Sequence, residues 1–556
     1  MATIQALTDQ LKKKFANAVT GVENPEATQL FIDIKKDKVR EICNEVIAQG
    51  GRYLVSVGTD YLAKDGTLGL IHTFAFDKEH YFASLRTATK EMEPIESITP
   101  DIPNAGWSER EYMDLLGMKF TNHPKPKKLV TADDWPADIY PLRKEVPFNI
   151  KPLAAENVAY QLDECPDGCS IVPFGPYHPT QHEPAHFALF VDGETIKGSD
   201  YRGFMIHRGV EKLAQTQISY NEIPFLAERI CGICGSVHAA SFSQAVEIAA
   251  GHKISRRAEY IRTIMLEIER VHSHLLWLGV AGHLIGFDTV FMQAWRVREP
   301  IMWLCERLTG SRKTYGMIVI GGVRRDITPE LKQDILNVIG TIEKEMVTIK
   351  NAIIGDTAIH RRTKDVGYIT KEDTIKWSLV GPVARARGVD IDARRDQPYA
   401  AYDEMKFDVP VVDNCDVWGT VLVRVLETFE AISIIRQALD KMPNDGPILM
   451  PFDDALPAGR HGITAVEAPR GEVTHYVITG EENRPERWRV RAPTYPNLQG
   501  VPMMLLNNQL ADVPIIIGSI DPCFSCTERM EVVDLRNGGM KVMSQSELEA
   551  LSRNKG

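Results

Sequence analysis

Two cysteine pairs constrain the fold of this chain, because they lie at opposite ends of a long middle segment. They are Cys231 with Cys234, in ERICGICGSVH, and Cys523 with Cys526, in DPCFSCTERM. Only the folded chain can bring pairs so far apart to one place. Four thiolates gathered in this way form a soft, all-sulfur site suited to nickel, zinc or iron–sulfur chemistry. The sequence therefore predicts a metal site inside a large folded core.

A structural zinc site is the simplest alternative, because two C-x-x-C halves are its usual composition. Zinc ribbons and knuckles, however, place their pairs on short hairpins about 12 to 20 residues apart. Each pair here also has a group nearby that can exchange protons or form hydrogen bonds, namely His238 and Asp521. A closed structural site needs no such groups, so the flanking residues favour a reactive metal centre.

Length and composition predict a globular protein with more than one domain. The chain has 556 residues, which is too long for a single core. Its 44% of hydrophobic and 25% of charged residues are typical of a soluble protein. A net charge of −11 leaves no basic face for nucleic acid, so we expect no nucleic-acid partner.

The N-terminus carries no apolar run of the signal-peptide type, which predicts cytoplasmic residence. The most apolar stretch, residues 275–295, contains His283, Asp288 and three glycines. Together with a helical pattern that continues around it, these residues favour a buried core helix over a membrane span.

The other cysteines are not expected to bind metal. Cys43, Cys305 and Cys415 are predicted to be small core residues, because cytosolic thiols stay reduced and a disulfide framework is improbable. Cys165 and Cys169 flank a Pro-Asp-Gly turn with no further ligand close in sequence. They are predicted to lie in a loop as free thiols.

The first domain is predicted to span residues 1–150 and to be a small α/β domain. Helical patterns cover residues 4–19 and 37–49, and apolar runs at 53–62 and 72–78 indicate strands. Nothing in this segment suggests chemistry. We interpret it as a docking and scaffolding domain.

The second domain is predicted to span residues 151–529 and to be mainly α-helical with peripheral β segments, which gives an α+β protein overall. Helical periodicity covers 256–279, 331–354 and 416–442, a hairpin is expected at 186–198, and strands are expected at 472–479 and 486–492. The first of these helices is expected to bury one face, with Ile261, Ile264, Met265, Ile268, Val271 and Leu275. Residues 530–556 form a C-terminal tail.

The two cysteine motifs, RICGICGSVH and DPCFSCTER, match the metal-binding motifs of nickel–iron hydrogenase large subunits. Four further motifs match in family order, namely residues 173–187, 191–194, 207–214 and 467–477. The chain thus resembles a group 4, energy-converting hydrogenase of the formate hydrogenlyase type. Its first domain resembles the 30 kDa subunit of respiratory complex I, and its second is also similar to the 49 kDa subunit.

The resemblance implies a nickel–iron centre held by four cysteines. Cys231 and Cys523 would be terminal nickel ligands. Cys234 and Cys526 would bridge nickel to an iron that carries carbon monoxide and cyanide. Cleavage or formation of dihydrogen needs such a metal together with a nearby base, because dihydrogen is a poor acid in water.

The resemblance also implies roles for residues around the centre. Glu183 takes the position of the proton-transfer glutamate. Arg470 would hang its guanidinium over the open metal position, and Pro469 would shape the pocket beside the diatomic ligands. Asp521 would orient Arg470 or the metal cluster, and His238 would donate a hydrogen bond to a bridging thiolate, as groups around metals commonly do.

Two further implications concern the C-terminal part. Glu211 matches a glutamate that binds a magnesium or iron ion in many relatives, although Arg529 replaces the histidine that helps to bind that ion there. A maturation endopeptidase would cut between Arg529 and Met530 and remove the tail.

The resemblance finally implies partners and a location. Electrons would pass through a small iron–sulfur subunit, and complex I-like membrane subunits and a formate dehydrogenase are expected. The chain would reduce protons with electrons from a low-potential donor such as formate, on the cytoplasmic face of the inner membrane. The alternatives are a complex I-like quinone or NADH oxidoreductase subunit and a structural zinc protein.

Overall fold

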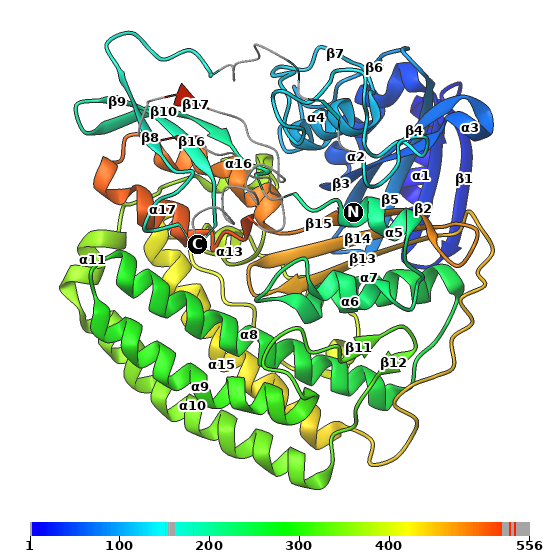
Figure 1. The fold of residues 1–556 in the computed structure, drawn as a ribbon. Helices are drawn as coiled ribbons and strands as arrows, with labels where there is room; N and C mark the ends of the chain where they lie inside the picture. Colours follow the sequence, from blue (N-terminus) through cyan, green and yellow to red (C-terminus); the bar gives the residue numbers. More distant parts are fainter. Residues whose placement is uncertain are drawn as a thin grey trace, which may run out of the picture.

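The computed structural model describes residues 3–150, 152–153, 155, 162–181, 183–205 and 207–524, together with the backbone of 533–534 and 539–540. Helices and strands are mixed, so the α+β prediction is confirmed. Figure 1 shows three regions, which are a sheet domain at the N-terminus, a central sheet, and a bundle of long helices.

The N-terminal domain is built on a five-stranded sheet with the order β1-β2-β5-β4-β3. The strands are β1 (Val19–Glu26), β2 (Gln29–Ile34), β3 (Arg52–Tyr61), β4 (Thr67–Phe76) and β5 (Tyr81–Lys90). The predicted strands at 53–62 and 72–78 correspond to β3 and β4. The predicted helix at 4–19 is too long, because α1 (Ile4–Lys14) gives way to β1, whose Val19 pairs with Ile34.

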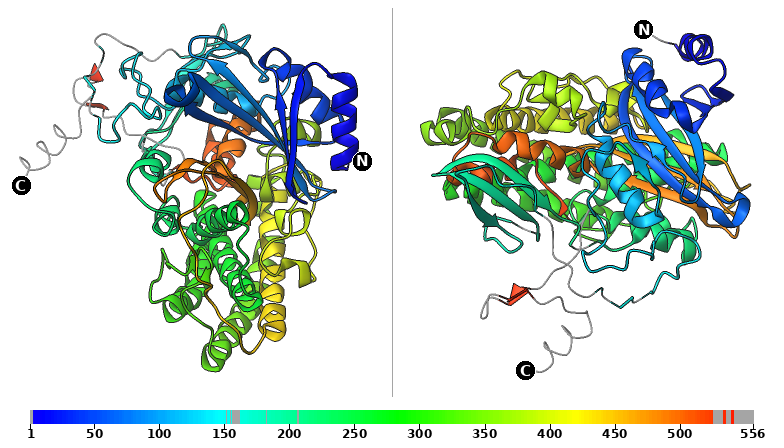
Figure 2. Two further views of the ribbon diagram at one scale, coloured as in Figure 1. Left: turned by 90° about the vertical axis from the view of Figure 1, so that its right-hand side faces the viewer. Right: turned by 90° about the horizontal axis from the view of Figure 1, so that it is seen from above.

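Each face of this sheet packs on something different, because neighbouring residues of a strand point to opposite faces. Leu30 and Ile32 of β2 join a core with α1, α2 (Val39–Ala48) and α4 (Ala105–Leu116). Phe31, between them, joins a second core on the opposite face. Figure 2 shows α1 at the periphery of the molecule.

The second core is shared with the central sheet of the large domain. That sheet consists of β13 (His461–Ala468), β14 (Gly471–Thr479) and β15 (Pro485–Arg491), in this order. It contributes Ile463, Ala465, Tyr476 and Ile478 to the contact. In Figure 1 the orange strands β13–β15 lie between the blue N-terminal sheet and the green helices α6 and α7.

Buried arginines of β15 join the two domains. Arg487 Nε donates to the carbonyl of Gly58 at 2.7 Å, and Arg489 forms two hydrogen bonds of 2.6 and 2.9 Å with the carboxylate of Glu111. Paired guanidinium and carboxylate groups can be buried only when the geometry satisfies both. The N-terminal domain is therefore fixed to the central sheet by apolar packing and specific polar contacts.

The large domain contains the predicted bundle of long helices. Its main members are α8 (Arg256–Leu284), α9 (Asp288–Thr309), α10 (Pro329–Gly355) and α15 (Val417–Lys441). The stretch 275–295 is not one helix, because α8 ends at Leu284 and a turn with Gly286 at φ 81° precedes α9. Within the described residues, no helix is both long and apolar enough to cross a membrane.

Helix α8 is more deeply buried than its amphipathic pattern predicts. Besides the apolar face, Arg262, Glu267, Glu269 and Arg270 are all fully buried. The predicted apolar face is buried, and the other faces are buried as well, because neighbouring elements surround the helix and pair its charged residues.

The remaining elements carry the two cysteine motifs and their surroundings. A second sheet has the order β10-β9-β8, and the predicted hairpin at 186–198 is confirmed, with Gly193 and Glu194 as the turn that the pair Asp192 and Thr195 closes. Its strands are β8 (Ser170–Phe174), β9 (His186–Asp192) and β10 (Thr195–Arg202), and the helices are α5 (Val210–Thr216), α6 (Ile223–Glu228), α7 (Gly235–Ala250), α16 (Thr494–Leu505) and α17 (Val513–Ser519). The shorter elements are η1 (Lys36–Lys38), α3 (Leu62–Asp65), β6 (Ile95–Glu96), β7 (Phe120–Thr121), β11 (Ile318–Val319), β12 (Gly322–Val323), α11 (Thr357–Thr363), α12 (Lys371–Lys376), α13 (Gly381–Arg385), α14 (Ala393–Asp396), η2 (Tyr402–Glu404), η3 (Leu510–Asp512), β16 (Val533–Asp534) and β17 (Gly539–Met540).

The cysteines outside the two motifs are free thiols. Cys43 and Cys305 are buried as predicted, whereas Cys415 is half-buried in a loop with φ 63° and is not a core residue. Cys165 and Cys169 are half-buried, and the Cys165 thiol lies 3.6 Å from the Cys169 carbonyl.

Candidate metal centre

Cys231 and Cys234 lie at the start of the buried helix α7. Cys231 is in the turn that follows α6, and Cys234 is the N-cap residue of α7. The backbone N–H groups of Ile233 and Cys234 lie 3.4 and 3.5 Å from Cys231 Sγ. N–H donors and the positive end of a helix stabilise a thiolate. The local fold thus favours Cys231 as a thiolate ligand.

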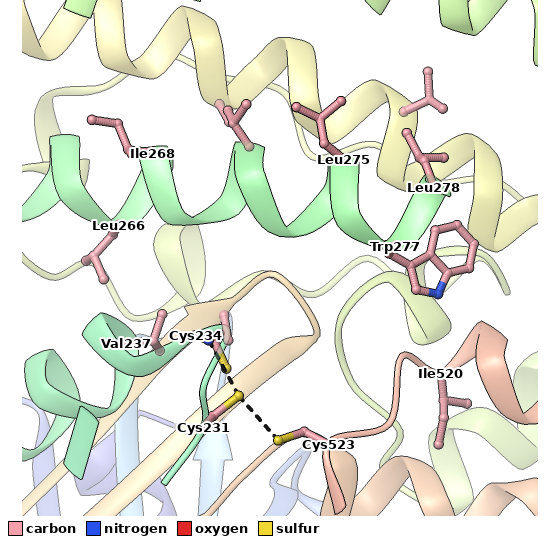
Figure 3. Packing of buried hydrophobic residues seen from close by; sticks show 14 of the residues in the cluster. Cys231, Cys234, Val237, Leu266, Ile268, Leu275, Trp277, Leu278, Ile520 and Cys523 are labelled. Carbon is pink, nitrogen blue, oxygen red and sulfur yellow. Dashed lines mark hydrogen bonds between the residues drawn. The ribbon is translucent and has the colours of Figure 1, made fainter. Parts of the chain in front are cut away.

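Cys523 reaches the same place from the other end of the domain. It follows α17, and its backbone N–H donates to Thr494 Oγ1 at 3.1 Å. Its Sγ lies 3.3 Å from Cys231 Sγ (Figure 3). Cys231, Cys234 and Cys523 are only 1%, 1% and 6% exposed. The structure therefore brings the two motifs together in the protein interior.

Three of the predicted site residues lie outside the described residues. They are Cys526, Arg529 and Met530, and the tail 530–556 is described only in the backbone of β16 and β17. Their ligand and processing roles stay predictions.

The buried thiols favour a cation among them. Contact with Cys231 is the largest cause that raises the pKa of Cys234 well above its usual range, and burial adds to it. Neighbouring anions in a buried site cannot all form unless positive charge compensates them. A soft divalent metal would supply such charge and prefers sulfur ligands.

Arg470 supplies a permanent positive charge at the site. It lies in the two-residue turn between β13 and β14, which the pair Ala468 and Gly471 closes. Its Nε donates to the Asp521 carbonyl at 2.8 Å, and its Nη2 donates to Asp521 Oδ1 at 2.9 Å. Burial opposes its charge, but Asp521 and the three thiols hold the pKa of Arg470 well above its usual range. Its Nη1 has no partner among the described residues.

The backbone fixes this hairpin tip from two sides. A Cβ at Gly381 would lie 2.3 Å from Gly471 Cα, so only glycine allows α13 to approach the turn this closely. Asp521 has φ 53°, a conformation that is uncommon for a residue other than glycine. Side chains and backbone thus hold Asp521 in the position from which it orients Arg470.

Pro469 and His238 also lie at the site. The Pro469 carbonyl accepts a hydrogen bond from Arg424 Nη1 at 3.3 Å. His238, on the first turns of α7, is fully buried, and its Nδ1 lies 3.0 Å from His475 Nε2. Burial lowers the pKa of His238 to about 4, while the charge of Cys231 opposes this shift. His238 is therefore neutral near pH 7.

The two predicted glutamates are placed differently. Glu183 lies in the loop just before β9, and its side chain is half-buried. Glu211, on α5, accepts hydrogen bonds from Arg487 Nη1 at 2.6 Å and from the Val490 N–H at 3.0 Å. Within the part of the chain that the structure describes, no three metal-ligating side chains gather around Glu211. Its carboxylate is paired with arginine.

Two residues that support the first cysteine motif were not predicted. Lys313 Nζ donates to the Ile233 carbonyl at 2.8 Å. Glu269 of α8 accepts hydrogen bonds from the N–H groups of Ser236 and Val237, at 3.1 and 3.2 Å, and burial raises its pKa to about 7. Neither residue carries a sequence signal, because Lys313 lies in an irregular loop and Glu269 lies in a helix far along the chain.

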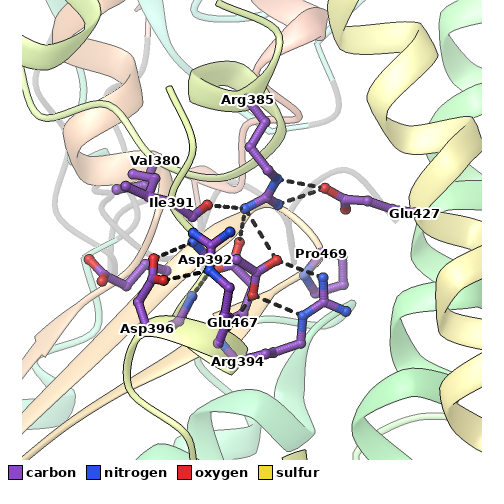
Figure 4. Close-up of polar contacts among 12 residues, drawn as sticks. Val380, Arg385, Ile391, Asp392, Arg394, Asp396, Glu427, Glu467 and Pro469 are labelled. Carbon is purple, nitrogen blue, oxygen red and sulfur yellow. Dashed lines mark hydrogen bonds and ion pairs between the residues drawn. The ribbon is translucent and has the colours of Figure 1, made fainter. Parts of the chain in front are cut away.

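A buried network of charges supports the Arg470 hairpin. It joins α8, α13, α14, α15 and β13, and it contains equal numbers of arginines and carboxylates. Its members are Arg270, Arg385, Arg394, Arg424, Arg470, Glu267, Asp392, Glu427, Glu467 and Asp521. Arg385 bridges Glu427 and Glu467, with Nε and Nη1 distances of 2.8 and 2.9 Å (Figure 4). Because Glu467 directly precedes Ala468, the network anchors the strand that enters the hairpin.

Arg424 links this network to the site through His274, because Arg424 Nη1 lies 3.4 Å from His274 Nδ1 and His274 Nε2 lies 2.9 Å from Glu427 Oε2. Its Nη1 lies 3.4 Å from Asp521 Oδ2, and the guanidinium lies over the Trp277 ring at 4.5 Å from its centroid. It is fully buried, and burial lowers its pKa to about 10. Asp521 therefore accepts hydrogen bonds from two buried arginines, Arg424 and Arg470.

Comparisons with known proteins agree with this architecture. Residues 32–151 match the family model of the respiratory-chain NADH dehydrogenase 30 Kd subunit, and 285–461 and 449–529 match that of the 49 Kd subunit. Residues 208–294 match the nickel-dependent hydrogenase model.

Individual relatives cover nearly the whole chain. Formate hydrogenlyase subunit 5 of Escherichia coli (strain K12) is 39% identical over 534 residues, which cover 94% of this chain and 93% of the relative. Hydrogenase-4 component G of the same organism is 37% identical over 551 residues, covering 98% and 96%. A solved structure of an archaeal respiratory membrane complex, the membrane-bound sulfane sulfur reductase, contains a chain with 30% identity and a TM-score of 0.62. That match covers 66% of this chain and 100% of the other.

Fold and family matches together define a nickel-dependent oxidoreductase class built on a scaffold shared with respiratory complex I. Within this class, the chain belongs to the family of group 4 nickel–iron hydrogenase large subunits of the formate hydrogenlyase type. It is an oxidoreductase that acts on hydrogen, and the family match supports a nickel–iron centre. The three buried thiols and the unpaired Arg470 Nη1 among the described residues fit such a centre.

Proposed function

We propose that Cys231 and Cys523 are terminal nickel ligands and that Cys234 and Cys526 bridge nickel to an iron carrying carbon monoxide and cyanide. The observation that carries this proposal is the 3.3 Å distance between the sulfurs of Cys231 and Cys523. The chain then reduces protons to dihydrogen with electrons from a low-potential donor, with formate as the source. The name of the relative formate hydrogenlyase subunit 5 favours formate.

When bound, the nickel–iron centre supplies the site at which protons and electrons combine. The chain supplies the proton path and the electrostatics. Cys523 Sγ holds a proton next to the metal, and the Glu183 carboxylate exchanges it with the exterior. Arg470 keeps its charge throughout, because a guanidinium does not titrate near neutral pH, and Asp521 holds it in place. Burial of the thiols excludes bulk water.

Electrons must come from partner subunits. The two cysteine pairs are committed to the nickel–iron centre, so a small iron–sulfur subunit would deliver the electrons. Complex I-like membrane subunits and a formate dehydrogenase complete the proposed assembly, on the cytoplasmic face of the inner membrane. The solved relative belongs to a respiratory membrane complex, which supports a membrane assembly. We do not extend the proposal to a magnesium or iron ion at Glu211, because Arg487 already pairs with that carboxylate.

Metal content and intact mass, measured on one sample purified without oxygen from its native host, test the proposal. We expect about one nickel and one iron per chain, and a mass that ends at Arg529 because an endopeptidase removes 530–556. Zinc with the tail attached, in cells whose maturation is intact, would instead support the structural zinc alternative. A metal-free chain that reduces quinone would support the complex I-like alternative.

Glu183→Gln is expected to suppress hydrogen turnover while nickel stays bound. Glutamine keeps the size of the side chain and can form hydrogen bonds, but it cannot accept and release a proton. General acid–base groups typically raise the reaction rate about 100- to 10,000-fold, so we expect a loss in this range. Hydrogen evolution and nickel content should be measured together. Glu194→Gln, on the exposed turn between β9 and β10, is the control. Wild-type turnover in Glu183→Gln would remove Glu183 from the proton path.

A further inference from the structure

Three buried polar side chains form a row that ends at the cysteine site. Trp488 of β15, His475 of β14 and His238 of α7 are all 0% exposed. Trp488 Nε1 donates to His475 Nδ1 at 3.1 Å, and His475 Nε2 lies 3.0 Å from His238 Nδ1. His475 and Trp488 are diagonal neighbours on one face of the sheet, because Trp488 pairs with Val477, two residues after His475. That face packs on α7.

The direction of each hydrogen bond in this row follows from chemistry. An indole N–H can only donate, so His475 Nδ1 must be an acceptor. The proton of His475 is then on Nε2 and is donated to His238 Nδ1. His238 Nδ1 must therefore be an acceptor too, and the proton of His238 is on Nε2. A charged His238 is incompatible with the row, because it would place two N–H groups against each other.

The last donor of the row belongs to the helix that begins at the first cysteine pair. His238 lies one helical turn after Cys234, and the charge of Cys231 acts on its imidazole. Its Nε2 is buried and has no hydrogen-bond partner among the described residues. A buried donor without a partner costs about 1–3 kcal/mol, so its presence points to an acceptor that the bound site supplies. Thiolate sulfur is such an acceptor.

We propose that Trp488 and His475 are positioning residues that fix the tautomer of His238, so that its Nε2–H always donates to a thiolate of the metal centre. This inference rests on the proposed function. An N–H donor withdraws electron density from the thiolate. The metal centre would then have less electron density to donate into the carbon monoxide by back-bonding. The opposite tautomer would direct a lone pair at the same sulfur and remove this effect.

Four variants separate this role from packing. Trp488→Phe removes the donor that His475 Nδ1 has among the described residues, and His475→Leu removes the donor to His238. His475→Gln keeps a carbonyl acceptor for Trp488 and an amide donor for His238. Phe242→Leu is the packing control, because the Phe242 ring contacts the Trp488 ring edge-on with centroids 5.2 Å apart but has no polar atom in the row.

Two measurements apply to each variant. Nitrogen-15 NMR of histidine-labelled, nickel-free full-length precursor reports the tautomer without any metal. We expect His238 and His475 to be Nε2–H tautomers in the wild type and in Phe242→Leu, and His238 to be the Nε2–H tautomer in His475→Gln. We expect a population of Nδ1–H imidazole in Trp488→Phe and His475→Leu. In matured protein, infrared spectra of Trp488→Phe and His475→Leu should show an additional carbon monoxide band at a lower wavenumber than the wild-type band.

The outcomes are distinct from failure of the proposed function. The inference would be overturned if His238 or His475 of the wild type were found in the Nδ1–H or the charged form. It would also be overturned if Trp488→Phe and His475→Leu left the tautomers and the carbon monoxide bands unchanged. A new band in Phe242→Leu would also overturn it, because packing alone would then explain the shift. If the wild type contains no nickel and shows no diatomic-ligand bands, the proposed function fails, and the NMR result still decides the tautomer assignment.

Discussion

Cys523→Ser is expected to abolish both nickel binding and hydrogen turnover. The Cys523 sulfur lies 3.3 Å from the Cys231 sulfur and is 6% exposed, so it forms a buried contact between the two motifs. Serine has a similar size, but its hydroxyl is a harder and much less acidic ligand than a thiol. The substitution therefore removes the metal chemistry with little change in packing.

The measurement is nickel content and hydrogen evolution of variant and wild type produced with the same maturation machinery. We expect no bound nickel in Cys523→Ser and an unprocessed chain with residues 530–556 attached. Cys43→Ser is the matched control, because this cysteine is equally buried but lies in the core of the N-terminal domain. Stoichiometric nickel with normal turnover in Cys523→Ser would contradict the proposed ligand set.

Elements with a strong periodic pattern could be predicted from sequence. The helices at 256–279, 331–354 and 416–442 correspond to α8, α10 and α15, because burial against neighbours imposes a 3.6-residue period on each. The break between α8 and α9 was missed, since apolar residues continue through the turn at Gly286. Periodicity reports which residues are buried, and it does not report where a backbone changes direction.

The contact between the two domains could not be predicted. Strands β4 and β14 are buried on both faces although polar residues interrupt their apolar pattern, so the sequence does not show what covers each face. Gln29 Nε2, for example, donates to the Ile463 carbonyl at 3.3 Å, although the two residues lie in different domains. Nothing in the local sequence specifies such a partner.

The charged network escaped prediction for a different reason. Arg385, Arg394 and Glu427 are fully buried, whereas charged residues in a helical pattern are usually assigned to the solvent face. Although burial opposes it, Arg385 holds the pKa of Glu427 well below its usual range. Glu427 is therefore ionised, whereas burial raises the pKa of its network neighbour Glu467 to about 7, a difference that only the folded arrangement reveals.

Arg470→Lys is expected to keep nickel but to lower hydrogen turnover by about 100- to 1,000-fold, the range observed when one preorganised charge-stabilising donor is removed. Arg470 uses Nε and Nη2 to hold Asp521 and leaves Nη1 towards the site. Lysine has the same charge, but its ammonium group is not planar. It cannot form the two parallel hydrogen bonds to Asp521 and also present a further donor to the site. Nickel content and hydrogen evolution should be measured, with exposed Arg307→Lys as the control.

The role of Asp521 can be separated by a second substitution. Asp521→Asn keeps one acceptor for Arg470 but leaves the buried Arg424 without its carboxylate, and we expect a smaller loss than in Arg470→Lys. If Asp521 acts by positioning Arg470, the variant with both Arg470→Lys and Asp521→Asn should lose about as much hydrogen turnover as Arg470→Lys alone. The effects of two groups that act as a unit are not additive in free energy. If the fold-loss of turnover in the double variant equals the product of the two single-variant losses, the two residues act independently. Wild-type turnover in Arg470→Lys would show that the geometry of the guanidinium is not required.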